Sequence, residues 1–138
     1  MDYQKLEGVM RRLGLVAGEI IMKVYEAEDF NVRAKSDASP VTEADEAADA
    51  HISAGLKAAF PDVLLVTEEQ AETHGESAGS FLIVDPLDGT KEFINRDKDF
   101  TVNIALVRKG TPEIGVVYAP ARAVLYAGRP GEAAEVSV

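Results

Sequence analysis

Two aspartates three positions apart, Asp85 and Asp88, follow the apolar run FLIV and precede Gly89 and Thr90 in the stretch FLIVDPLDGT. Two carboxylates held this close repel each other unless one is protonated or a cation lies between them. In a chain without cysteine, oxygen ligands favour a hard ion such as Mg²⁺ or Mn²⁺. The carbonyl of Leu87 could face the same ion, and the hydroxyl of Thr90 could orient a water molecule. The stretch therefore indicates a metal site.

The same residue types also form ordinary turns, and Asp-Gly alone is far more often a turn than a site. The neighbouring sequence favours the site, because a second apolar run, VLLVTEEQ, ends in Glu68 and Glu69. Phosphatases of the haloacid dehalogenase type place their paired aspartates two positions apart, whereas Asp85 and Asp88 are three apart. On a regular strand, a shift of one residue turns a side chain to the opposite face. The spacing therefore disfavours that family.

Two helices are predicted to precede these strands. Apolar residues at intervals of three and four predict an amphipathic helix over residues 3–27. A second helix is predicted over residues 39–60, with Thr42 as its N-cap and Phe60-Pro61 at its end.

Strands are predicted to form most of the remaining chain. Apolar runs predict buried strands over residues 63–70 and 81–84, the second ending at Asp85, and a short helix follows near residues 90–95. Alternating residues predict a hairpin over residues 100–120 and a further strand over residues 123–128. The fold class predicted is α+β, with two N-terminal helices packed on a mostly antiparallel sheet.

The composition limits the classes of partner. Asp and Glu number 24 against 14 Lys and Arg, which gives a net charge of −10. This charge disfavours binding to nucleic acid polymers but allows a small phosphorylated ligand where bound cations reverse the local sign. No apolar run has the length of a membrane span, and the N-terminus lacks a signal-peptide layout. We therefore expect a cytoplasmic protein.

Three ordered motifs together resemble the inositol monophosphatase superfamily of metal-dependent, lithium-sensitive phosphatases. They are KSDASPVTEAD (Lys35–Asp45), VTEEQ (Val66–Gln70) and VDPLDGTKEF (Val84–Phe93). Within the superfamily, DPLDGTKEF and FTVNIALVRKGTPEIGVVYAP are most similar to the branch of CysQ-type 3'(2'),5'-bisphosphate nucleotidases, enzymes of sulfur assimilation.

The resemblance covers the chain to about Gly128 and implies a domain over residues 1–128. That domain would be the N-terminal layer of the αβαβα sandwich of the superfamily. We expect residues 129–138 to be a loose tail, and the C-terminal α/β domain of the family to lie outside these 138 residues.

The resemblance also implies a set of metal ligands for two or three Mg²⁺ ions, with Mn²⁺ as an alternative. The implied ligands are Glu68, Asp85, the carbonyl of Leu87, and Asp88.

Further roles are implied around the metal ligands. Asp45 and Thr90 resemble the pair that orients and deprotonates the attacking water, with Glu68 as a third catalytic residue. Lys35 would lie on a loop beside the site. The implied substrate contacts are Glu68, Asp88, Gly89 and Thr90.

The function implied is Mg²⁺-dependent hydrolysis of 3'-phosphoadenosine 5'-phosphate to AMP and phosphate. Two alternatives stay open: a phosphatase for inositol or sugar phosphates, and a catalytically inactive metal-binding interaction domain. A homodimer and peripheral association with the cytoplasmic side of the inner membrane also stay open.

Overall fold

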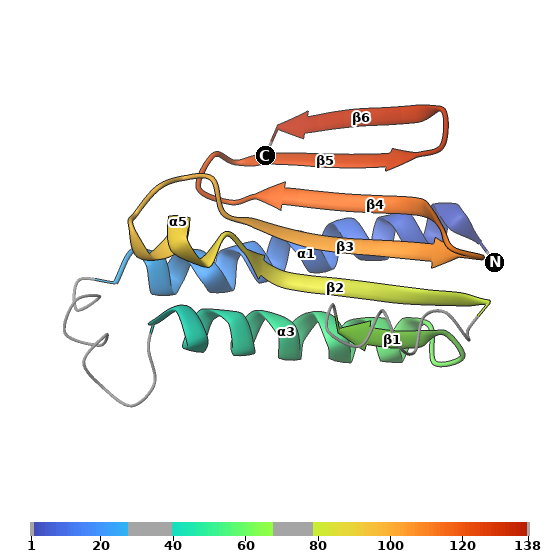
Figure 1. Ribbon diagram of the computed structural model, residues 1–138, viewed down its shortest axis with the longest axis horizontal. Coiled ribbons are helices and arrows are strands. Elements are labelled where there is room, and N and C mark those ends of the chain that lie inside the picture. Colours follow the sequence, from blue (N-terminus) through green and yellow to red (C-terminus); the bar gives the residue numbers. More distant parts are fainter. Residues whose placement is uncertain (1, 28–39, 68–78, 138) are drawn as a thin grey trace.

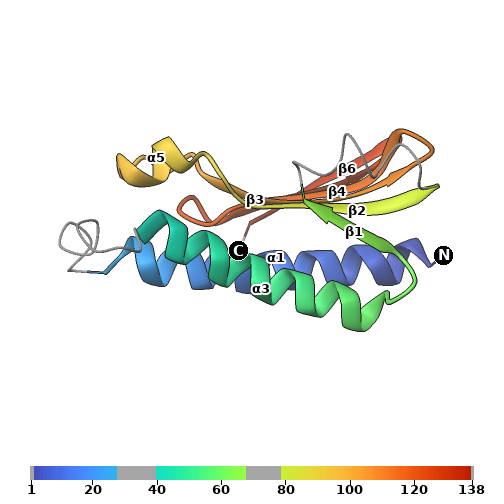
Figure 2. The same ribbon diagram turned by 60° about the horizontal axis from the view of Figure 1, so that its bottom comes forward.

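Two long helices lie on one face of a six-stranded sheet in the part of the chain that the computed structural model describes, residues 2–27, 40–67 and 79–137 (Figures 1 and 2). The long helices are α1 (Tyr3–Tyr25) and α3 (Pro40–Ala59). The strands are β1 (Leu64–Thr67), β2 (Ser80–Asp88), β3 (Thr101–Arg108), β4 (Thr111–Ala119), β5 (Val124–Arg129) and β6 (Glu132–Ser137). A short helix, α5 (Thr90–Ile94), connects β2 to β3.

The sheet confirms the predicted α+β class with a mostly antiparallel sheet. Its strand order follows the sequence from β1 to β6. β1 pairs in parallel with β2, and every later pair is antiparallel. The hairpin of β3 and β4, predicted over residues 100–120, turns at Lys109 and Gly110.

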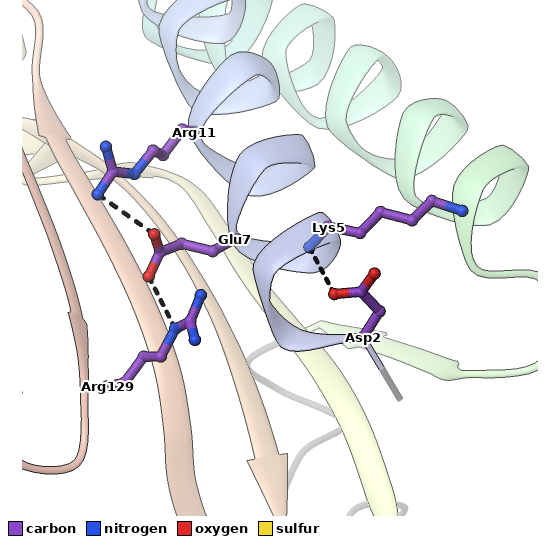
Figure 3. A network of polar contacts seen from close by, with 5 residues as sticks. All are labelled: Asp2, Lys5, Glu7, Arg11 and Arg129. Carbon is purple, nitrogen blue, oxygen red and sulfur yellow. Dashed lines mark hydrogen bonds and ion pairs between the residues drawn. The ribbon is translucent and has the colours of Figure 1, made fainter.

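Helix α1 begins and ends close to its predicted limits. The Asp2 carboxylate accepts a hydrogen bond from the Lys5 amide at 3.1 Å and caps the first turn (Figure 3). Such a cap contributes about 1 kcal/mol. The buried stripe includes Ala17 and Gly18 in addition to larger apolar residues, so small side chains bring the helix close to the sheet.

Helix α3 corrects one detail of the prediction. The helix begins at Pro40, so Thr42 lies inside its first turn and is not the N-cap. The fixed φ of proline suits the first position of a helix, where no intrahelical partner exists for an amide hydrogen. The helix ends at Ala59, next to Phe60-Pro61, as predicted.

The predicted loose tail is wrong, because residues 132–137 form β6 and pair with β5 along its length. Pro130 and Gly131 connect the two strands, and Gly131 has a φ of 79°. Proline followed by glycine suits the centre of a type II turn, which makes this dipeptide the overlooked sequence signal.

Arg129 also anchors this part of the sheet to the helix layer (Figure 3). Its guanidinium donates to the Glu7 carboxylate on α1 at 3.1 Å, and Arg11 forms an ion pair with the same carboxylate at 3.3 Å. The Glu7 side chain is only 19% exposed, so these contacts are less screened than surface pairs.

Gly18 marks the closest approach of α1 to the sheet. A Cβ atom added there would lie 2.2 Å from the Tyr118 ring on β4. That ring is rigid and 8% exposed, so it has little room to move. We expect Gly18→Ala to destabilise the fold by roughly 1–3 kcal/mol, as overpacking does.

The matched control is Gly8→Ala, on the same helix. A Cβ atom at Gly8 has no atom within 4 Å, so this variant should gain up to about 1 kcal/mol from helix propensity. Urea unfolding of both variants measures the difference. Equal stability changes would show that the contact of Gly18 with Tyr118 does not limit the packing.

Candidate functional site

A β-bulge in β2 brings the two aspartates of the sequence motif to one face of the sheet. Asp85 pairs with Asn103 and Asp88 pairs with Thr101, so three steps along β2 match two steps along β3. The extra residue reverses the alternation that would otherwise point Asp85 and Asp88 to opposite faces. The predicted end of the strand at Asp85 is therefore wrong, since β2 continues through the bulge to Asp88.

The residues between the aspartates account for the bulge. Pro86 has no amide hydrogen to donate to the ladder, and proline within sheets is found at bulges and edges. The Leu87 side chain is 3% exposed and belongs to the core. Its carbonyl remains the predicted metal ligand.

Asp85 and Asp88 line one cavity of about 330 Å³. Asn103 is its third polar lining residue, and it lies directly opposite Asp85 on β3. The Asn103 amide donates to the Thr101 hydroxyl at 3.0 Å, which fixes the orientation of the amide group. The remaining lining is Ile83, Ile104, Ala105, Gly115, Val116 and Val117. The cavity thus has polar groups at the end of β2 beside an apolar floor.

Helices α1 and α3 cover one face of the sheet, and no long helix of the described residues lies on the other face (Figure 2). The lining residues place the cavity mainly on this second face. Along β3 and β4, the buried residues that pack under the helices alternate with half-buried ones such as Asn103, Ala105 and Val117, which line the cavity. This alternation is typical of a sheet with one face on the core.

The turn after Asp88 requires glycine. Gly89 has a φ of 90°, in the left-handed region, and a Cβ atom there would lie 3.2 Å from the Phe100 Cα. The Gly89 carbonyl accepts from the Phe93 amide at 3.0 Å, which begins α5. Thr90 is the first residue of this helix and is exposed.

Asp45 lies in the first half of α3, and α3 contacts α5. Figure 2 shows α5 above the N-terminal end of α3. Burial raises the pKa of the Asp45 carboxyl, and the charges of Asp49 and Glu46 raise it further. A carboxylate with a raised pKa is a better proton acceptor, which suits the role predicted for Asp45.

Two predicted site residues, Glu68 and Lys35, lie outside the described residues. Within residues 2–27, 40–67 and 79–137, no group of three or more His, Asp or Glu side chains could hold a metal ion. The predicted ligand set therefore depends on Glu68 to join Asp85 and Asp88.

Asn103 is a site residue that the sequence reading missed. A signal was available, because Asn103 is a polar residue inside the apolar strand segment VNIALV. Its position opposite Asp85 could be known only from the strand register.

None of the described helices has both the length and the apolar composition needed to cross a bilayer.

Sequence comparisons identify relatives over nearly the whole chain. The profile of the inositol monophosphatase family matches residues 2–137. The chain is 46% identical over 123 residues to the 3'(2'),5'-bisphosphate nucleotidase CysQ of Escherichia coli strain K12, covering 85% of this chain and 49% of that protein. It is 37% identical over 122 residues to the Nus factor SuhB of the same strain, covering 88% of this chain and 46% of SuhB.

Structural comparison gives the same relationship. The crystal structure of CysQ from Bacteroides thetaiotaomicron matches with a TM-score of 0.84 at 36% identity. The match covers 99% of this chain and 51% of that chain. The chain thus spans about half the length of the curated relatives it matches.

Proposed function

Because the chain belongs to the inositol monophosphatase family, we propose that it hydrolyses a small phosphomonoester with the help of Mg²⁺. The proposed substrate is a 3'(2'),5'-bisphosphate nucleotide, 3'-phosphoadenosine 5'-phosphate, which yields AMP and phosphate. The chain resembles both CysQ and SuhB, and the match to SuhB covers 88% of it. Its identity to CysQ is higher, 46% against 37%, and this supports the choice of substrate.

The observation that carries the proposal is the bulge that directs Asp85 and Asp88 to one cavity. Carboxylate oxygens are the ligands that Mg²⁺ prefers, so the described donors fit this ion. The proposed ligands are Asp85, Asp88, the Leu87 carbonyl and Glu68. Bound Mg²⁺ would supply an acidified water molecule and neutralise charge on the phosphate.

Residues around the carboxylates would direct the water and the substrate. The Thr90 hydroxyl orients the attacking water, and Asp45 accepts its proton. The water oxygen bonds to phosphorus while the ester bond from phosphorus to the leaving oxygen breaks, and the leaving oxygen takes a proton from solvent to become a hydroxyl of AMP. Gly89 and Thr90 contact the phosphate through their backbone amides. Lys35, which lies outside the described residues, is proposed as a further site residue from the resemblance of its motif.

The proposal is tested by comparing kcat/KM for 3'-phosphoadenosine 5'-phosphate and inositol 1-phosphate at the same Mg²⁺ concentration. Lys91 follows Thr90 and is exposed, so it can pair with the second phosphate of the nucleotide. Hydrogen bonds to charged groups contribute about 1.5–3 kcal/mol, which corresponds to a preference of roughly tenfold or more. We therefore expect the nucleotide to be preferred by at least that factor.

Lys91→Gln should reduce this preference, whereas the control Lys57→Gln should not. Lys57 is also exposed but lies near the C-terminal end of α3, whereas α5 lies above the N-terminal end of that helix (Figure 2). A preference for inositol 1-phosphate would assign the chain to the inositol branch of the family.

A second candidate function is a metal-binding interaction domain without catalysis. The cavity-bearing sheet face that no long described helix covers favours it. It predicts Mg²⁺ binding with no phosphate release from either substrate, so the same assay separates the two candidates.

A further inference from the structure

The residue that ends α5 has a strained backbone. Arg96 has a φ of 62°, in the left-handed region, where bulky residues are uncommon. Its amide donates to the Phe93 carbonyl at 3.2 Å, and the Asp97 amide donates to the Glu92 carbonyl at 2.8 Å. These two bonds form a Schellman motif, which usually has glycine at the position of Arg96. A strained backbone conformation persists only where surrounding contacts stabilise it, so the Arg96 side chain should make such contacts.

The compensation comes from Tyr25, the last residue of α1, which lies 71 positions away in the sequence. The Tyr25 hydroxyl donates to the Arg96 carbonyl at 2.9 Å, and the Arg96 guanidinium donates to the Tyr25 carbonyl. The guanidinium carbon also lies 4.4 Å from the centre of the Tyr25 ring. The Tyr25 carbonyl is among the last four of α1, which lack partners within the helix, so Arg96 satisfies an acceptor that the helix leaves open.

Tyr25 also packs against the core of the α5 region. Its ring centre lies 5.7 Å from that of Phe93 and 5.1 Å from that of Phe100, and both phenylalanines are fully buried. Phe93 and Phe100 pack edge to face at 5.3 Å. Gly89 lies directly against the Phe100 backbone, since a Cβ atom there would come within 3.2 Å. A continuous set of contacts thus joins the end of α1 to the turn that follows Asp88.

Helix α5 needs this support because it has only five residues. Isolated helices shorter than about 12 residues are marginal in water. In Figures 1 and 2, the C-terminal end of α1 lies beside α5 at the same end of the sheet.

We propose that Tyr25 and Arg96 form a lock that holds the turn Asp88–Gly89–Thr90 in place beside Asp85. Both are positioning residues, since they act on the site through α5 and the two buried phenylalanines. The functional part of this inference rests on the proposed function, because it takes this turn to bind metal and phosphate.

Two variants separate the lock from a merely structural role. Arg96→Gly replaces the arginine with the residue that usually occupies this position of a Schellman motif. If Arg96 only ended the helix, this change would not destabilise α5. Tyr25→Phe removes the hydroxyl and keeps the ring that packs on Phe93 and Phe100. Lys109→Gly is the matched control, because Lys109 has a φ of 52° in the exposed turn between β3 and β4.

The first measurement is amide hydrogen exchange at Phe93 in the metal-free chain. This amide donates to the Gly89 carbonyl and reports opening of the turn. We expect exchange about threefold to tenfold faster in Arg96→Gly and in Tyr25→Phe, as for loss of one hydrogen bond, and no change in Lys109→Gly. The two variants remove different hydrogen bonds between the same two residues, so the effect of the double variant should differ from the product of the two single effects if these contacts act together. If the Phe93 amide of Arg96→Gly exchanged at the wild-type rate, the proposed lock would be wrong.

The second measurement is the Mg²⁺ dissociation constant, with Mg²⁺ alone as the probe. It should rise by a similar factor in Arg96→Gly and stay unchanged in Lys109→Gly. Faster exchange with an unchanged constant would overturn the role of the lock at the site. If the wild-type chain did not respond to Mg²⁺, the proposed function would fail, while exchange at Phe93 would still decide whether the lock exists.

Discussion

Asp88→Asn is expected to abolish Mg²⁺-dependent phosphate release, with kcat lower by at least about 100-fold. Loss of a group that merely supports a metal ligand lowers metal affinity or activity by roughly 10- to 100-fold. Asp88 is proposed as a ligand itself, so its loss should have at least this effect. Asparagine keeps the size of the side chain but removes the charge that attracts the ion. Phosphate release at saturating Mg²⁺ for the wild type, together with the Mg²⁺ dissociation constant, measures the loss.

The fold of this variant should stay intact. Asp88 is exposed and lines a cavity with Asp85, so removing one charge relieves repulsion in the metal-free chain. The free energy of unfolding in EDTA should therefore hold or rise. Asp62→Asn is the control, since Asp62 is exposed just after α3 and lines no part of the described cavity. An unfolded Asp88→Asn protein, or one with full activity, contradicts the proposed role.

Asp45→Asn should lower kcat by about 10²- to 10⁴-fold, the usual contribution of a general base. Because Asp45 is proposed to accept a proton and not to bind metal, the Mg²⁺ dissociation constant should change little. Glu46→Gln removes the same charge one position later and should keep most of the activity. A large loss of Mg²⁺ affinity in Asp45→Asn would instead indicate a metal ligand.

Because the pKa of Asp45 is raised, the difference in stability between Asp45→Asn and the wild type should depend on pH. Burial is the main cause of the shift, and it disfavours the charged form in the folded chain. Stability from this group is thus fully present below its usual pKa of 3.8 and is lost as pH rises through the higher folded value. Asparagine cannot ionise, so Asp45→Asn should be more stable than the wild type at pH 7, with no gain below pH 3.8. Urea unfolding at both pH values in EDTA checks the sign.

Most elements of the fold could be predicted from the sequence because their patterns are local. The stripe of apolar residues every three or four positions specifies α1, and alternation specifies the hairpin of β3 and β4. The motif around Asp85 and Asp88 likewise indicated carboxylates suited to a metal. In each case the deciding residues lie within a few turns or strand positions of one another.

The features that were missed depend on pairing partners, which the residues of the feature do not show by themselves. The β6 strand forms because the neighbouring β5 offers it an edge across the Pro130-Gly131 turn, and the residues of β6 show no strong alternation. The contacts of Arg96 with Tyr25 account for its left-handed backbone, and no local pattern connects the two residues.

The site shows the same division between local and tertiary information. By its residue types alone, the sequence determined that two carboxylates, a glycine and a threonine follow an apolar run. Only the pairing of β2 with β3 decided that Asp85 and Asp88 share a face and that Asn103 lies beside them. The reason is that a bulge shifts the alternation by one residue, and the register that shows the shift belongs to both strands.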